Sequence, residues 1–174
     1  MTTSIRALIL GLILSTSFFA NAFDLKLENL GPWKLTVIEK KSVYLGNAEA
    51  TLTLPRLDND FSPTVLIEKL PMAAAPESRE EWHHLIFLNA NKGKFVVMNE
   101  RAFKTGTIDR YVVEFRSDIG ADSMLHSIVM ATSINGEIYA FHFQNFPKTF
   151  GDHVRAIRQL FRTMEVSISR STRP

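Results

Sequence analysis

Apolar and polar residues alternate along two stretches in the first third of the chain. In Trp33–Lys40 and in Glu49–Leu54, apolar residues recur at every second position. Successive side chains of an extended chain point to opposite faces, so this pattern predicts strands with one buried face. Pro63–Leu70 predicts a third strand, which the polar Pro55–Asp60 segment separates from the second.

A capping box begins the first predicted helix. Ser78 and Glu81 have the Ser-x-x-Glu spacing of this motif. In a capping box the serine hydroxyl accepts a hydrogen bond from the glutamate amide, and the glutamate carboxylate reaches back toward the start of the helix. Trp82 and Leu85 follow at helical spacing. This pattern predicts a helix of about three turns near residues 79–90.

The longest apolar stripe lies near the end of the chain, with steps of three and four residues. Its members are Phe146, Phe150, Val154, Ile157, Leu160, Phe161 and Met164. Charged residues fill the other side, and Pro147 suits a first turn, where its missing amide costs nothing. The stripe predicts a long amphipathic helix that packs on a sheet. A short strand, Glu165–Ser169, is expected to follow it.

Strand patterns return between the two predicted helices. Lys94–Lys104 predicts a strand or a bent pair of strands, and Ile108–Arg116 predicts a strand after the Thr105-Gly106-Thr107 turn. Ser117–Ser123 is expected to be a polar loop.

The Asn135-Gly136 pair between Met124–Ser133 and Glu137–Gln144 predicts a β-hairpin. A two-residue loop fixes the register, so one face is expected to carry large side chains and the other small ones. The predicted cross-strand pairs are Ile134–Glu137, Thr132–Tyr139, Met130–Phe141 and Ile128–Phe143, with Ala131–Ala140 and Val129–His142 on the opposite face.

The order strands, helix, strands, helix predicts an α+β fold. We expect a curved, mainly antiparallel sheet with the long C-terminal helix packed on one face and a second, shorter helix, which together form an α/β/α sandwich.

The N-terminus has the features of a secretory signal peptide. Arg6 precedes the apolar run Ala7–Leu14, and Ala20-Asn21-Ala22 offers small residues two apart for cleavage. The apolar run is shorter than the about 20 residues of a spanning helix, although an uncleaved membrane anchor stays an alternative. We predict a signal peptide over residues 1–22, a single globular domain over 23–174, and a periplasmic location, with full secretion as the alternative.

Composition narrows the classes of function. The chain has 20 Lys and Arg against 18 Asp and Glu, a formal net charge of +2, which is no basis for gripping nucleic acid. The absence of cysteine excludes disulfides, a thiol nucleophile, cysteine-based metal sites and an N-terminal lipid anchor. After signal cleavage, no stable insertion in a membrane is expected.

The order of elements resembles that of a known family. The matching features are a strand ending in Leu-Pro (Thr51–Pro55), the extended Pro63–Glu68, the helix start Ser78–Trp82, Phe95-Val96-Val97, Gly106, the strands Arg110–Phe115 and Gly136–Phe141, and the helix Phe150–Met164. Over roughly residues 33–168, the chain resembles the Mog/PsbP/DcrB-like group of small α/β/α sandwich domains. The resemblance implies a non-enzymatic protein that acts by contacting other proteins, as envelope lipoproteins, photosystem accessory subunits, GTPase-binding proteins and secretion-associated adaptors do.

No residue pattern indicates catalysis, a cofactor or a metal site. His83 and His84 are adjacent and point about 100° apart on a helix, so they do not chelate as a pair. His126 and His142 fall on opposite faces of the predicted hairpin. No nucleophile elbow, phosphate-binding loop or dinucleotide motif occurs. We therefore predict a protein that is not an enzyme.

Two functions remain from different classes. The first is an exported protein that binds another envelope or secreted protein in an accessory, adaptor or immunity-type role. Its candidate docking surface is the small-residue hairpin face: Ser127, Val129, Ala131, Ile138, Ala140 and His142. The alternative for this face is burial beneath the helix at residues 78–90. The second function is a small-molecule or metal binder or a hydrolase, with a cleft near Trp82, His83, His84 and the Asp118–Asp122 loop.

Overall fold

A computed structural model describes residues 24–38, 48–55, 62–70, 76–89, 95–105, 108–120, 123–145 and 147–168. The first five elements are β1 (Leu25–Glu28), β2 (Lys34–Val37), β3 (Ala50–Thr53), β4 (Thr64–Leu70) and α1 (Arg79–Asn89). The remaining elements are β5 (Phe95–Thr105), β6 (Ile108–Gly120), β7 (Ser123–Ile134), β8 (Glu137–Asn145), α2 (Pro147–Thr163) and β9 (Glu165–Ile168).

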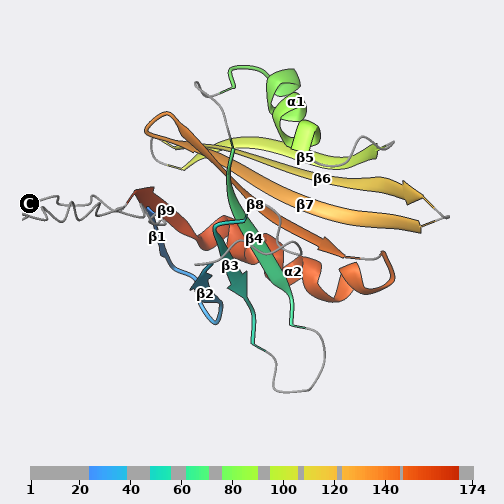
Figure 1. Cartoon of the computed structure of the whole chain (residues 1–174), viewed down its shortest axis with the longest axis horizontal. Helices are drawn as coiled ribbons and strands as arrows, with labels where there is room; N and C mark the ends of the chain where they lie inside the picture. Colours follow the sequence, from blue (N-terminus) through green and yellow to red (C-terminus); the bar gives the residue numbers. More distant parts are fainter. Residues whose placement is uncertain are drawn as a thin grey trace, which may run out of the picture.

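The centre of the molecule is a seven-stranded sheet in the order β2-β3-β4-β8-β7-β6-β5, in which every neighbouring pair is antiparallel. The helices α1 and α2 lie on opposite faces of this sheet (Figure 1). A separate antiparallel pair joins β1 near the N-terminus to β9 near the C-terminus. The predicted α+β class and the mainly antiparallel sheet are confirmed.

The β7–β8 hairpin has the predicted register. Ile134 pairs with Glu137, and the pairing continues outward through Met130 and Phe141. Asn135 and Gly136 both have positive φ, at 52° and 81°. These values suit a two-residue turn of the kind that Asn-Gly favours, because its backbone twist matches that of the two strands.

The two faces of the sheet form two cores. The larger core lies under α2 and contains Phe141 and Phe143 of β8 together with Ile157 and Phe161 of the helix. The smaller core lies under α1, where Trp82 packs among small and medium residues of β7 and β8. The large side chains of the hairpin therefore belong to the larger core under α2, and its small side chains belong to the smaller core under α1.

Side-chain hydrogen bonds define one end of each helix. At the start of α1, the Glu81 amide donates to Ser78 Oγ at 3.1 Å, as the capping box predicts, and the Glu81 carboxylate accepts the Glu77 amide. At the end of α2, the buried Arg110 of β6 donates to the carbonyls of Phe161 and Met164, at 3.3 and 2.9 Å. A cation at this end also interacts favourably with the helix dipole.

The structure differs from the sequence predictions at several strand ends. Most of the predicted Ser117–Ser123 loop is strand, because β6 extends to Gly120 and β7 begins at Ser123. The register shifts between Asp118 and Gly120, and Gly120, which pairs with Ser123, has a positive φ of 85°, a conformation that glycine adopts without strain. The strand β1 had no predicted counterpart.

Several predicted segments lie outside the described residues. They include the signal peptide, residues 39–40 of the first predicted strand and most of the polar Pro55–Asp60 segment. The turn residues Gly106 and Thr107, Asp122 of the second candidate site, and Phe146 at the start of the apolar stripe lie outside them as well. None of the helices in the described ranges is long and apolar enough to cross a membrane.

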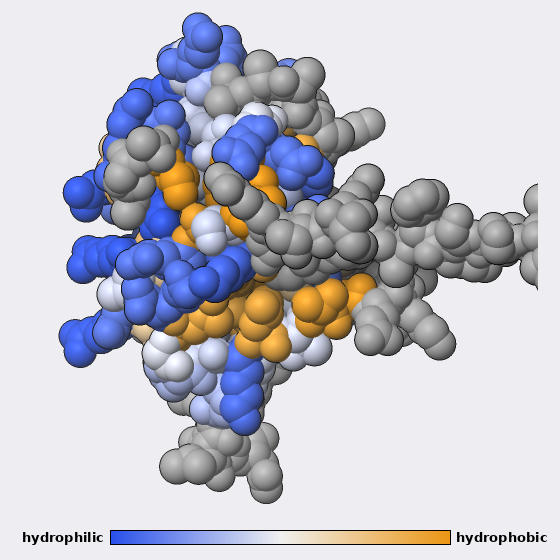
Figure 2. Space-filling model, turned by 90° about the vertical axis from the view of Figure 1, so that its left-hand side faces the viewer, coloured by the Kyte–Doolittle hydropathy of each residue, from blue (hydrophilic) through white to orange (hydrophobic). Residues whose placement is uncertain are grey.

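The edge strand β2 leaves Leu35 and Val37 exposed. Figure 2, which faces the side where β1, β2 and β9 lie, shows surface apolar residues gathered in a band there.

Candidate functional site

The small-residue hairpin face is assembled as predicted and lies in the interior. Val129, Ala131, Ile138 and Ala140 belong to the core beneath α1 and are each at most 3% exposed. Ser127 is buried as well, and His142 is half-buried. The structure therefore has the arrangement named as the alternative, in which the helix covers this face.

The residues of the second predicted site are spread over different environments. Trp82 is buried and stacks on Tyr111, with ring centroids 5.8 Å apart and planes 9° from parallel. His84 is exposed. Asp118 lies seven residues beyond Tyr111 on β6, which at about 3.3 Å per residue is roughly 23 Å along the strand. Asp118 accepts the Gly120 amide at 2.8 Å.

His83 takes part in a polar cluster that joins α1 to the sheet. The Glu100 carboxylate of β5 accepts the Tyr111 hydroxyl at 2.6 Å, lies 2.7 Å from His83 Nε2 and forms an ion pair with Arg79. The Tyr111 hydrogen bond and the contacts to His83 and Arg79 lower the pKa of Glu100, against a smaller effect of burial. Burial raises the pKa of Tyr111, and Glu100 raises it further. This cluster holds α1 in place.

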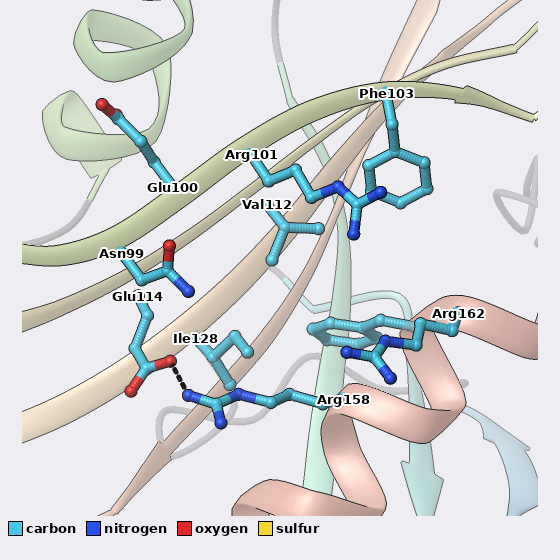
Figure 3. Close-up of a pocket in the computed structure, with 10 residues that line it drawn as sticks. Asn99, Glu100, Arg101, Phe103, Val112, Glu114, Ile128, Arg158 and Arg162 are labelled. Carbon is cyan, nitrogen blue, oxygen red and sulfur yellow. Dashed lines mark hydrogen bonds and ion pairs between the residues drawn. The ribbon is translucent and has the colours of Figure 1, made fainter.

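A pocket on the opposite face of the sheet has the strongest features of a binding site. It lies between β5, β6 and α2, has a volume of about 380 Å³, and contains three arginines. Its lining residues are Asn99, Glu100, Arg101, Phe103, Val112, Glu114, Ile128, Arg158, Phe161 and Arg162. Arg101, Arg158 and Arg162 approach the space between β5 and α2, while Glu100 points away toward α1 (Figure 3).

The arginines reach the pocket from two elements. Arg158 and Arg162 are four residues apart on α2, so they lie on one face of the helix. Arg101 comes from β5, and its guanidinium lies 5.3 Å from the ring centroid of Phe103. Val112, Ile128 and Phe161 contribute apolar surface between them. The pocket thus combines hydrogen-bond donors of positive charge with an apolar wall.

One acidic group balances part of this charge. Glu114 is buried, forms an ion pair with Arg158 and lies 3.0 Å from His126 Nε2. The His126 ring stacks on Phe150, with centroids 3.7 Å apart. Burial lowers the pKa of His126, and Glu114 opposes that effect. Glu114 therefore orients Arg158.

The chemistry of this pocket is that of anion recognition. Guanidinium groups bind carboxylates and phosphates through paired hydrogen bonds, and apolar walls favour a ligand with an apolar part. Within the described ranges, no three His, Asp or Glu side chains are grouped so that they could hold a metal ion. The predicted absence of a cofactor stays a prediction.

Sequence reasoning missed the pocket. The polar side of α2 included Arg158 and Arg162, but such residues usually face solvent without a partner. A basic pair at i, i+4 on the last helix, together with Arg101 two residues before Phe103, is the signal available in the sequence. Only the packing of α2 on β7 and β8, which leaves a pocket between the helix and the neighbouring strands β5 and β6, brings the three side chains to one place.

Comparisons with known proteins identify the fold. No protein-family profile matches the chain, and none of the curated proteins matches its sequence. Among solved structures, a Pseudomonas aeruginosa protein of unknown function, PA94, described as a candidate regulator, has a TM-score of 0.52 and 11% identity over 65% of this chain and 78% of its own.

Two further solved structures cover more of the chain. Cyanobacterial PsbP (CyanoP) from Synechocystis has a TM-score of 0.51 and 12% identity, over 82% of this chain and 92% of its own. LpqN of Mycobacterium tuberculosis, involved in cell envelope biogenesis, has a TM-score of 0.50 and 11% identity over 83% of each chain. At such identities the likeness shows the fold alone: this chain has a PsbP-like fold.

Proposed function

We propose that this chain is an exported, non-catalytic protein of the periplasm that binds another envelope or secreted protein in an accessory, adaptor or immunity-type role. The signal-peptide pattern at residues 1–22 supports export, with residues 23–174 as the functional domain. The PsbP-like fold supports the finer assignment to the Mog/PsbP/DcrB-like group. LpqN, which shares the fold, is involved in cell envelope biogenesis.

The observation that carries the proposal is the pocket between β5, β6 and α2. Three arginines border an apolar wall, which suits an acidic side chain flanked by apolar residues on a partner. Arginine is enriched among the residues that dominate binding at protein interfaces. The small-residue hairpin face is buried, so the arginine pocket replaces it as the proposed binding surface.

A parallel capture experiment tests this function. The purified protein, the double variant Arg101→Glu/Arg162→Glu and the control Arg155→Glu would each be immobilised and exposed to envelope and secreted fractions of the source organism. Arg155 is exposed on α2 and does not line the pocket. We expect one stoichiometric protein that the wild type and Arg155→Glu retain and the double variant loses. Equal retention by all three proteins would contradict a role for the pocket.

A small anionic ligand is the second candidate, because the pocket volume falls within the about 300–1,000 Å³ of small-molecule sites. Titration calorimetry with glutarate and with inorganic phosphate tests it. Saturable binding that the double variant abolishes, without a captured protein, would favour this second function.

A further inference from the structure

The strand β5 forms one open edge of the sheet. In the described part of the chain it pairs with β6 alone, and β5 is the last strand in the sheet order. With 11 residues it is also far longer than β2, the 4-residue strand at the other edge. Such an edge has a row of backbone amides and carbonyls that can pair with a strand of another chain.

The side chains along β5 offer apolar contacts beside this backbone. Phe95, Val96 and Met98 are 42%, 59% and 50% exposed. The pairing register with β6 shifts between Val97 and Asn99, so a β-bulge lies at Met98. The beginning of β5 is therefore an apolar surface, and basic residues follow at Arg101 and Lys104. A basic residue discourages pairing with a neutral or basic strand, whereas an acidic residue directly opposite it stabilises the pair.

Contacts to α1 hold β5 in a fixed position. Glu100, in the middle of the strand, is bound by Tyr111 of β6 and by Arg79 and His83 of α1. A strand held in this way is already ordered before a partner arrives, which reduces the entropy lost on binding.

The strand β5 also forms one wall of the arginine pocket. Asn99, Arg101 and Phe103 alternate along it and line the pocket on the α2 side of the sheet. In an antiparallel pair, the residue directly opposite has its side chain on the same face, with Cβ atoms about 4.5–5.5 Å apart. The residue opposite Arg101 on an added strand would therefore have its side chain beside Arg101 and close to the opening toward Arg162.

From this geometry we infer that the partner binds by strand addition. An extended segment of a partner protein pairs antiparallel with β5 and places an acidic side chain opposite Arg101 and apolar side chains opposite Val96 and Phe103. Antiparallel addition continues the arrangement of the whole sheet. The positive charge of the pocket favours an acidic residue in the partner segment. The apolar side chains of β5 favour apolar residues at the other positions on the same face of that segment. This inference rests on the proposed function and names the kind of segment that the site binds.

A designed peptide provides the probe. The sequence Val-Thr-Glu-Thr-Asn-Thr-Val, with a fluorophore at its N-terminus and an amidated C-terminus, puts Val, Glu, Asn and Val on one face of a strand. Fluorescence anisotropy with the purified protein is expected to show saturable binding below about 1 mM. Replacing Glu by Gln in the peptide, or using the Arg101→Glu/Arg162→Glu protein, should weaken binding about tenfold or more. The Arg155→Glu protein should bind as the wild type does.

Backbone methylation distinguishes strand addition from side-chain binding. Two further peptides carry N-methyl groups, one on the first, third and fifth residues and the other on the second, fourth and sixth. Alternate amides of a strand point to opposite sides, so strand addition predicts that one of these peptides loses binding about tenfold or more while the other retains it.

The outcomes separate the inference from the proposed function. If both methylated peptides bind as the parent does and the arginine variant does not, strand addition is overturned and the pocket stands. If one methylated peptide alone loses binding but the Gln peptide and the arginine variant bind normally, the edge is a docking strand and the role of the pocket is overturned. If no peptide saturates, strand addition at β5 is overturned, and the capture experiment still tests the function.

Discussion

Arg110 is the side chain that joins the end of α2 to the sheet most directly. It is 2% exposed, and its guanidinium donates to two carbonyls at and just after the C-terminus of α2. Burial lowers its pKa, with Glu165 opposing that shift. The arginine stays charged, because its ordinary pKa is above about 12.

We expect Arg110→Met to lower the free energy of unfolding by about 1–3 kcal/mol, since it leaves two buried carbonyls without these donors. Urea unfolding followed by circular dichroism would measure the change. Arg110→Lys keeps the positive charge but does not have the planar guanidinium that donates to both carbonyls. Its free energy of unfolding should therefore lie between those of the wild type and Arg110→Met. A methionine variant as stable as the wild type would show that water satisfies these carbonyls equally well.

His142 should make the stability depend on pH. Its Nε2 is buried without a hydrogen-bond partner, and burial lowers its pKa to about 4. The unfolded chain takes up the proton near pH 6.5, so between about pH 6.5 and 4 the unfolded state binds more protons. Stability should therefore fall as the pH falls through this window.

The His142→Leu variant tests this dependence. Unfolding measured between pH 6.5 and 4.5 should show a smaller loss of stability than in the wild type. His126 has a lowered pKa from burial as well, so part of the slope should remain. His84→Leu, at an exposed position of α1, is the control for a histidine-to-leucine replacement as such. If His142→Leu loses as much stability as the wild type over this pH range, His142 is not a source of the pH dependence.

At the scale of elements, polar and aromatic contacts join α1 to β5 and β6, beside the apolar core beneath the helix. Trp82 stacks on Tyr111, whose hydroxyl donates to Glu100. Tyr111→Phe keeps the ring and removes that donor. The hydrogen bond from Tyr111 is the largest cause of the lowered pKa of Glu100, so this pKa should rise in the variant.

Carboxyl chemical shifts in a pH titration would report the change at Glu100. A carboxylate with a lowered pKa stabilises the fold above its unfolded pKa and loses this contribution as the pH falls. Tyr111→Phe should therefore flatten the acid limb of the stability curve below about pH 4.5. If the Glu100 titration is unaffected, Arg79 and His83 alone hold the carboxylate.

At the scale of the whole molecule, the open sheet is the feature with the most evident consequence. Its two edges, β2 and β5, carry exposed apolar side chains, and Val96 is 59% exposed. Exposed apolar edges favour association between chains. We expect Val96→Lys to reduce light scattering on heating without lowering the free energy of unfolding, because the side chain makes few buried contacts.

Thr36→Lys is the matched control, since Thr36 is exposed on the other edge strand. Because β2 has 4 residues against 11 in β5, it offers less backbone to a second chain, so Thr36→Lys should reduce scattering less than Val96→Lys does. If both variants reduce scattering equally, added charge explains the effect and the β5 edge has no special role.

The sequence determined the features that depend on neighbouring residues. The capping box placed the start of α1, Asn135-Gly136 placed the hairpin and its register, and the long stripe placed α2. These predictions are confirmed because hydrophobic periodicity and turn geometry depend on residues close together in the sequence, where few backbone conformations are allowed. Together with the order of elements they were sufficient for the α+β class.

Only the tertiary structure decided which surfaces remain free and which side chains meet. The sequence pattern of the small-residue hairpin face is compatible with a docking surface and with a buried layer, and in the structure α1 covers this face. Arg101 and Arg162 are far apart in the sequence, and they share a pocket because α2 packs on β7 and β8 and leaves a space toward β6 and β5. Contacts between residues far apart in the sequence depend on how the amphipathic helices and the sheet pack as layers. The same local pattern of apolar and polar residues is compatible with many such packing arrangements. The local patterns therefore determined the elements, and packing decided the site.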